Sequence, residues 1–495
     1  MLELAPAELD ASGRPACHPS TRQNILSEIT DWATNPSCEQ NVFWYHGLAG
    51  SGKSTISTTI ANTFRELRRL GAFIFFDRAH PEQSHPSKVI RTLAYKLGSF
   101  DQRIGAAICS AIDHFPSIND ASPRMQFTKL IMESLATITD ILAEGPIVIV
   151  FDAIDECGDP AERDPLLQVL ATELGRLPST IRVLITSRPL EDIGNAFEGP
   201  PNILSRDLDV SSDSCSRDIS IYLKHKFEVI RKRARLPSEW PGEEVVQDLV
   251  TRSCGLFVWA TTVAKFIDSY NPPKHLAIIL RGEIAPSAQS ALDDLYKRAL
   301  EQAGRWDDED FVEHIRSVLG TVLVLQNPLT TSTLDQLIED GRSSDAISLL
   351  ACVIASEPTV HLLHPSFADF LFSRARSGQD IWYFDAAAYH QKLTLKCLDL
   401  LSNGLKRNIC NLTLSAAPKG ETVSDDTAYA CLFWINHICS SSGDDQLLVG
   451  HLEAFLNKHL LHWFEVMSIL GTSKDMIPLL YKLHHWIVVS LFHQL

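Results

Sequence analysis

The sequence predicts a doubly wound α/β layer, which is a parallel sheet with helices on both faces, followed by mostly helical regions. Three observations support this fold class. Apolar, β-prone runs alternate with helical patterns from residue 41 to about 207. The run 147–151 is apolar at every position, as expected of a strand that is buried on both faces. From residue 211 to about 300 the strand patterns disappear and helical patterns dominate.

A phosphate-binding loop is predicted at residues 47–55, between a strand and a helix. The segment satisfies the pattern G-x-x-x-x-G-K-[ST], which average composition would produce by chance in such a chain roughly two times in a hundred. The run 42–46 before it is apolar and β-prone. The residues after it recur at helical spacing and define one apolar face: Ile56, Ile60, Phe64 and Leu67. This context disfavours the alternative, a glycine-rich turn without a ligand.

Each residue type in this loop suits a phosphate group. Glycines let the backbone amides point at phosphate oxygens, and the helix N-terminus adds a fixed positive end. Lys53 would reach the β- and γ-phosphates, and the Ser54 hydroxyl would bind Mg²⁺. The predicted nucleotide-binding residues of the loop are Gly47, Gly50, Gly52, Lys53, Ser54 and Thr55.

A second group of candidate site residues follows the buried run 147–151. Asp152 falls at the carboxyl end of this strand, where open α/β sheets bind their ligands, and is predicted to hold Mg²⁺, directly or through water, opposite Ser54. Asp155 and Glu156 follow in the turn. One of them could orient or deprotonate the attacking water, whereas the other could bind the neighbouring chain or cap a helix. The sequence does not rank the two, and a simple acidic turn is the alternative.

A third polar group ends another apolar run, residues 181–185. Arg188 is placed to contact a γ-phosphate, which would let it distinguish ATP from ADP. The alternative is an ion pair with a carboxylate of its own turn. One more strand is expected at 72–77. The strand that carries Asp152 is therefore not the sequence neighbour of the phosphate-loop strand.

These motifs resemble the NACHT domain of the STAND class of signalling NTPases. The closest likeness is to the fungal, NLR-like NACHT proteins whose NTPase region is described as nephrocystin-3-like at its N-terminus. The likeness rests on residues 47–55, 151–156 and 184–189, on the lead-in 17–22, and on the segment His-Pro-Ser-Phe-Ala-Asp-Phe-Leu at 364–371. It covers roughly residues 15–375 and continues weakly to about 490. We recognise no effector domain before residue 15 and no repeat array after 490.

The resemblance and the changes in periodicity suggest an α/β P-loop NTPase followed by helical, winged-helix-like and all-helical regions. The expected boundaries are 1–40 for a lead-in, 41–207 for the NACHT domain, 208–305 for a helical domain, 306–380 for the winged-helix-like domain and 381–495 for a helical region. In related NACHT proteins the winged-helix histidine contacts the β-phosphate of ADP, and His364 matches it here. The alternative is a histidine that is satisfied by its own hairpin.

The resemblance implies an ATP/ADP-operated switch that uses Mg²⁺. Hydrolysis would be slow, and ATP binding would lead to opening and self-association in an intracellular, innate-immunity-like or heterokaryon-incompatibility-like response. A nucleotide-stabilised scaffold without turnover remains open, although the pair Asp155 and Glu156 argues against it. A metabolic P-loop NTPase or kinase also remains open, although the sequence shows neither an acceptor pocket nor an Arg-rich lid.

Composition excludes several other classes. The formal net charge of −17 over 495 residues disfavours nonspecific binding to nucleic acid or anionic membranes. No run of 18 apolar residues predicts a membrane span, and the N-terminus lacks the basic segment of a secretion signal. The 11 cysteines form no C-x-x-C pair, which fits reduced thiols. We therefore expect a cytoplasmic protein with unknown protein partners and no direct nucleic-acid partner. The basic cluster at 224–235 is expected to be a solvated helix face.

Overall fold

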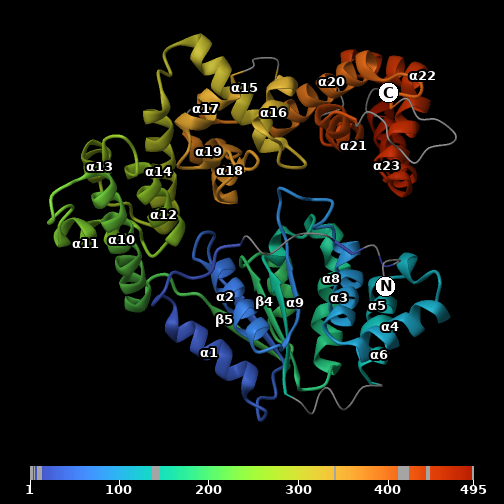
Figure 1. Ribbon diagram of the computed structural model, residues 1–495, viewed down its shortest axis with the longest axis horizontal. Coiled ribbons are helices and arrows are strands. Elements are labelled where there is room, and N and C mark those ends of the chain that lie inside the picture. Colours follow the sequence, from blue (N-terminus) through green and yellow to red (C-terminus); the bar gives the residue numbers. More distant parts are fainter. Residues whose placement is uncertain are drawn as a thin grey trace. The chain divides into compact units, whose positions relative to one another are not determined.

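The computed structural model describes residues 4, 6–7, 14–136, 145–338, 342–378, 380–410, 423–441 and 446–492. The chain divides into two units, residues 1–295 and 296–495, and the division falls within helix α14 (Ala288–Ala303). Figure 1 labels the elements, and each unit is described by itself below.

The described residues of the first unit contain a parallel sheet of five strands in the order β2-β3-β4-β1-β5. The strands are β1 (Val42–His46), β2 (Leu70–Phe75), β3 (Ile147–Asp152), β4 (Ile181–Ser187) and β5 (Ile203–Asp207). The predicted parallel sheet is thus confirmed. Because β4 lies between β1 and β3, the phosphate-loop strand and the strand of Asp152 flank the same neighbour.

Alternate residues along the strands supply two separate cores, which is why the strands read as continuous apolar runs. On one face, side chains such as Phe43 and Val150 pack with α1 (Gln23–Thr34) and α2 (Lys53–Glu66). On the other face, Trp44 and Ile149 pack with a second set of helices. That set includes α3 (Pro86–Phe100), α4 (Gln102–His114), α8 (Pro160–Glu173) and α9 (Glu191–Phe197). Figure 1 shows both layers, and the predicted double winding is confirmed.

Helix α2 confirms most of its predicted apolar face. Ile56, Ile60 and Phe64 are fully buried against the sheet. Leu67 is instead 58% exposed, so its predicted place in the core is wrong. The physical reason is that α2 ends at Glu66 and Leu67 is its C-cap, so Leu67 lies beyond the part of the helix that packs on the sheet.

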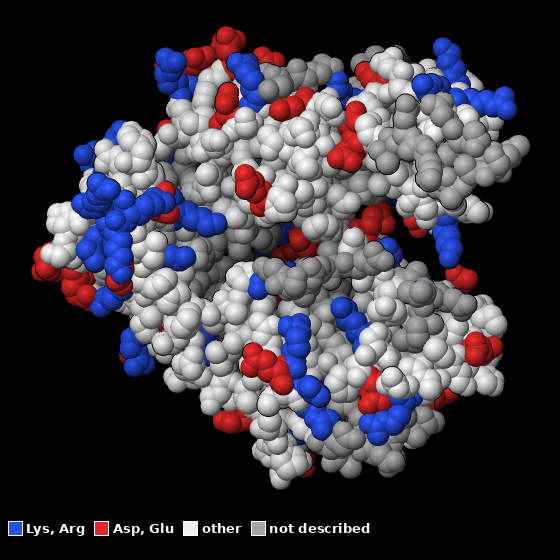
Figure 2. All heavy atoms as spheres, in the orientation of Figure 1, with Lys and Arg blue, Asp and Glu red and all other residues white. Residues whose placement is uncertain are grey.

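The first unit continues as helices after the sheet: α10 (Asp213–Ala234), α11 (Glu243–Arg252), α12 (Phe257–Ile267) and α13 (Pro272–Leu280). The apolar face of α10 is buried, as Leu223 and Phe227 show. Its basic side chains meet acidic partners. Lys224 Nζ lies 2.8 Å from Glu243 Oε1, and Lys232 Nζ lies 2.7 Å from Glu228 Oε1. Figure 2 shows Lys and Arg gathered over this region with acidic side chains at its rim, which fits a solvated face.

The second unit is mostly helical. Helices α15 (Glu309–Val324), α16 (Thr331–Ile338) and α17 (Ser343–Leu349) precede a short antiparallel hairpin of β6 (Ile354–Ala355) and β7 (His361–Leu362). Helices α18 (Pro365–Leu371), α19 (Arg374–Ser377), α20 (Ala386–Gly404), α21 (Asp425–Cys439), α22 (Gln446–Ile469) and α23 (Met476–Phe492) follow. The hairpin pairs Ile354 with Leu362 and Ala355 with His361, and Val360 forms an isolated bridge with Leu329. Across the described part of the chain, no helix combines the length and apolarity that a membrane crossing needs.

A buried histidine network joins helices of the second unit. The Nδ1 atoms of His390 and His437 lie 2.9 Å apart, and His437 Nε2 lies 2.9 Å from the Tyr429 hydroxyl. The His437 side chain has no exposed surface. Burial lowers the pKa of His390 to about 4, and burial together with His390 lowers the pKa of His437 well below its usual value. Both imidazoles are therefore neutral in the folded chain near pH 7.

This network predicts acid lability of the second unit. The pKa of each histidine is lower in the folded chain than in the unfolded chain, so the unfolded state takes up protons first as the pH falls. Stability is complete above about pH 6.5 and is lost as the pH falls towards 4. We expect a loss of about 2 kcal/mol from His390 alone by pH 5. Amide exchange of α20 and α21 peptides measures it, and His390→Gln should flatten the dependence. An equal acid slope in that variant would contradict the assignment.

Candidate functional site

The carboxyl ends of β1, β3 and β4 bring the predicted site residues to one edge of the sheet. The loop 47–55 leaves β1, Asp152 ends β3, and Arg188 follows β4. Thr186 on the central strand connects them, because its hydroxyl donates to Asp152 Oδ1 at 2.7 Å and accepts from the Ala153 amide at 3.0 Å. The parallel order of the strands therefore places two motifs about one hundred residues apart in sequence at a single edge.

The phosphate loop has the backbone geometry of an anion site. Gly50 and Gly52 have φ values of 78° and 98°, a region that suits glycine, and Gly52 caps α2. Among the residues that the structure describes, the amides of Ala49, Gly50 and Gly52 donate to no acceptor. The first turn of α2 adds the amides of Lys53 and Ser54, which have no partner within the helix. These donors fit phosphate oxygens.

Lys53 lies in the middle of this loop. Its Nζ donates to the carbonyl oxygens of Gly47 and Leu48 at 2.7 and 2.8 Å. Burial lowers its pKa to about 8, against the opposing effect of the Asp155 carboxylate. A buried ammonium that is held mainly by carbonyls gains from an added anion, because a neighbouring negative charge favours its charged form. Thr55 lies in the same turn, where its hydroxyl donates to the Gly52 carbonyl at 2.8 Å.

Asp152 fits the predicted metal carboxylate by its chemistry and burial. Its side chain has no exposed surface, and its Oδ2 atom lies 2.8 Å from Arg14 Nη2. Carboxylate and hydroxyl oxygens are ligands that Mg²⁺ prefers, so Asp152 and Ser54 are a suitable protein contribution. Within the described residues, no three His, Cys, Asp or Glu side chains gather closely enough to hold a metal by themselves. Phosphate oxygens and water would have to complete the coordination of a magnesium ion here.

Asp155 and Arg188 form a buried pair, which the sequence did not predict. Arg188 Nε lies 3.2 Å from Asp155 Oδ2, and the Arg188 amide donates to Asp155 Oδ1 at 3.1 Å. Both carboxylate oxygens of Asp155 are thus engaged, and Arg163 Nη1 donates to the Asp155 carbonyl at 3.1 Å. The partner of Arg188 comes from the turn after β3, whereas the alternative considered was its own turn. Asp155 therefore holds Arg188 in place.

Glu156 differs from its neighbour. It is half-buried, and its Oε2 accepts from the Arg78 amide at a long 3.3 Å. Burial, and next the charge of Asp155, raise the pKa of Glu156 to about 7. A carboxylate with a pKa near the working pH suits proton transfer. The two acidic residues thus have separate environments, and Glu156 is the one whose pKa suits a general base.

Residues outside the predicted set also hold the loop. Arg22 Nη2 donates to the Ser51 carbonyl at 2.6 Å, and its guanidinium lies 4.6 Å from the centre of the Phe257 ring in α12. The Val258 amide donates to the Gly50 carbonyl at 3.0 Å. The lead-in motif 17–22 was the available signal for Arg22. For Val258 the signal was the segment 255–260, which resembles the helical segment that packs behind the nucleotide in NACHT proteins.

His364 lies in the second unit. It is the N-cap of α18, where its Nδ1 accepts from the Ser366 amide at 3.1 Å and lies 2.6 Å from the Ser366 hydroxyl. That hydroxyl is 2.7 Å from the Tyr296 hydroxyl. His364 therefore has a local capping role. Its predicted contact with ADP remains a prediction.

Two comparisons with known proteins bear on this site. Residues 20–188 match the family model for the nephrocystin 3 N-terminal region. The chain is also 23% identical to the vegetative incompatibility protein HET-E-1 of Podospora anserina, over 90% of this chain and 34% of that protein. The chain thus spans about a third of the length of this relative. Together these similarities confirm the resemblance to fungal NACHT proteins.

Proposed function

We propose that the chain is an ATP- and ADP-binding switch of the NACHT type, in which bound nucleotide controls self-association. The observation that carries this proposal is the direct link between the phosphate loop and the helical segment behind it. The Val258 amide binds the Gly50 carbonyl, and a Cβ atom on Gly50 would lie only 2.0 Å from Val258 Cγ1. A change in the backbone conformation of the loop at Gly50 would therefore alter its contact with Val258 of α12.

The roles in binding follow from the geometry of the loop. The amides of residues 49, 50, 52, 53 and 54 would hold the phosphates, with Lys53 supplying charge to the β- and γ-phosphates. Ser54 and Asp152 would hold Mg²⁺, which would supply positive charge against the charge that develops on the phosphates. Thr186 keeps Asp152 oriented by its hydrogen bond.

The roles in hydrolysis follow from the separate environments of the two acidic residues. Glu156 would accept the proton of the attacking water, because its raised pKa of about 7 matches the working pH. Asp155 would position Arg188, whose guanidinium is held at 3.2 Å on one side. Arg188 would contact the γ-phosphate and so distinguish bound ATP from bound ADP. Turnover would be slow and would reset the switch.

The second unit supplies the proposed lock. We propose that helices α15 to α17 and the β6–β7 hairpin after them form a small winged helix, and that ATP binding releases this element. His364 would donate to the β-phosphate of ADP in the closed state. Its Nδ1 is occupied as an acceptor by the Ser366 amide, so a neutral ring carries its proton on Nε2 and can donate from there.

His364→Ala and His364→Asn test the lock together. Asparagine is a good helix N-cap, whereas alanine is not, so only the alanine variant loses the cap of α18. Both variants lose a contact made in the closed state alone, and we expect ADP release to be about 10- to 150-fold faster in both. Stopped-flow release of a fluorescent ADP analogue measures this. Faster release in the alanine variant alone would mean that His364 is only a cap.

Two other functions make different predictions. A metabolic kinase would turn over faster when its acceptor is added, and a scaffold would bind ATP without turnover. Phosphate release with and without candidate acceptors separates them. By similarity to the vegetative incompatibility relative, the proposed setting is a cytoplasmic signalling response of the heterokaryon-incompatibility or innate-immunity-like kind. The comparisons cover about a third of that relative, so its further partners are not assigned to this chain.

A further inference from the structure

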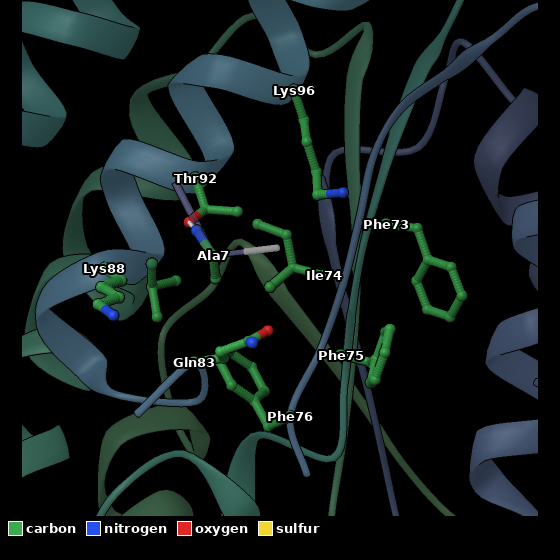
Figure 3. Close-up of a pocket in the computed structure, with 10 residues that line it drawn as sticks. Ala7, Phe73, Ile74, Phe75, Phe76, Gln83, Lys88, Thr92 and Lys96 are labelled. Carbon is green, nitrogen blue, oxygen red and sulfur yellow. Dashed lines mark hydrogen bonds between the residues drawn. The ribbon is translucent and has the colours of Figure 1, made fainter. Parts of the chain in front are cut away.

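Described residues near the N-terminus contact the sheet and the helices beside the phosphate loop. Leu4 is fully buried in the core of the sheet. The Ala7 amide donates to Thr92 Oγ1 of α3 at 2.9 Å, as Figure 3 shows beside Ile74 of β2. The Cys17 amide donates to Thr59 Oγ1 of α2 at 2.9 Å. We call residues 14–22 the N-terminal strap. Within it, Cys17 contacts α2 and Arg22 contacts the phosphate loop.

Arg14 at the start of the strap contacts the predicted metal carboxylate. Its Nη2 atom lies 2.8 Å from Asp152 Oδ2, and its guanidinium carbon lies 4.2 Å from the centre of the Phe75 ring. Asp152 is fully buried, whereas Arg14 keeps 22% of its side chain exposed. Because Thr186 donates to the other oxygen of Asp152, Arg14 takes the oxygen that is left. A buried carboxylate needs such a positive partner.

A magnesium ion and the Arg14 guanidinium need the same place. A metal bound to Asp152 requires a metal–oxygen distance of about 2.1 Å and room for the rest of an octahedral shell. A guanidinium at 2.8 Å from Oδ2 fills that room and repels a second cation. A metal ion that contacts Oδ2 directly would therefore compete with Arg14 for this oxygen.

We propose that Arg14 competes with Mg²⁺ for the carboxylate of Asp152. The metal–nucleotide complex then binds Asp152 only when the strap dissociates from this edge of the sheet. This inference rests on the proposed nucleotide site and adds a regulator to it. By thermodynamic linkage, anything that holds the strap down weakens metal–nucleotide binding, and bound metal–nucleotide frees the strap.

Metal binding by the full chain provides the direct test. Mn²⁺ serves as the probe, because electron paramagnetic resonance measures its free concentration in the presence and absence of ATP. Arg14→Gln is expected to lower the dissociation constant for Mn²⁺ about tenfold. Arg14→Lys keeps the positive charge and should stay close to wild type. Arg65→Gln, which removes an exposed arginine at the far end of α2, is the matched control and should change nothing.

A second readout needs no variant. Cys17 lies in the strap, with its Sγ 3.6 Å from Thr55 Oγ1, so release of the strap should expose this thiol. We expect Mn²⁺ with ATP to raise the alkylation rate of Cys17 several-fold, measured by peptide mass spectrometry, while the buried Cys397 stays unreactive.

The outcomes separate the two proposals. Unchanged or weaker Mn²⁺ binding in Arg14→Gln would overturn the competition, and weaker binding only with ATP would instead make Arg14 a phosphate contact. An alkylation rate of Cys17 that is the same with and without Mn²⁺ and ATP would also overturn the proposed competition. The wild-type chain could bind no nucleotide while Arg14→Gln still binds Mn²⁺ about tenfold better than wild type. That result would support the competition at Asp152 and overturn the proposed nucleotide switch.

Discussion

Glu156→Gln is expected to abolish ATP turnover while leaving ATP affinity within about twofold of wild type. The glutamine keeps the shape of the side chain and an oxygen to accept from the Arg78 amide, but it cannot take a proton. Removing a general base lowers the rate by about 10²- to 10⁴-fold. Single-turnover phosphate release, together with equilibrium binding of a fluorescent ATP analogue, measures both quantities in the same preparation.

Asp155→Asn is the matched control for this variant, because it changes the neighbouring carboxylate by the same one atom. Asp155 holds Arg188 in a buried pair, so its neutralisation leaves a buried guanidinium without its counter-charge. Breaking such a pair costs about 3–5 kcal/mol, so we expect a lower melting temperature as well as weaker turnover. Wild-type turnover in Glu156→Gln, with a fully folded and inactive Asp155→Asn, would mean that the two roles are reversed.

Lys53→Ala is expected to weaken ATP and ADP binding at least tenfold. Charge-assisted contacts of this kind contribute about 1.5–3 kcal/mol, and about 1.4 kcal/mol corresponds to a tenfold change in affinity. The free chain should stay folded, because burial disfavours the charged form of Lys53 and lowers its pKa, so its removal costs the free chain little. Titration with a fluorescent nucleotide measures the affinity, and a thermal melt shows whether the variant is folded. Unchanged affinity in a folded variant would refute the phosphate role of Lys53.

The sequence predicted the parts of the site that local patterns specify. The loop 47–55 and the strand ending in Asp152 are continuous segments, so spacing and apolar runs were enough to find them. The strand order could not be read from periodicity, because it depends on how distant segments pair. The short β6–β7 hairpin shows the same limit, since β-prone residues there lie mostly in turns.

The contacts that the sequence missed are long-range and polar. Arg14 meets Asp152 across 138 positions, and Thr186 meets it across 34. The pairing of Arg188 with Asp155 likewise joins two turns. Single charged residues have no periodicity that marks their partners, and only the fold brings them together. The separation of Asp155 from Glu156 also required the structure, because burial and neighbouring charge distinguish two adjacent acids.

The central claim is that the bound nucleotide sets the assembly state. Light scattering coupled to size exclusion, on Glu156→Gln with Mg²⁺ and either ADP or ATP, tests it most directly because this variant should retain ATP. The account predicts a monomer with ADP and a larger species with ATP, at equal protein concentration. The same mass with both nucleotides, in a preparation shown to bind each of them, would contradict it.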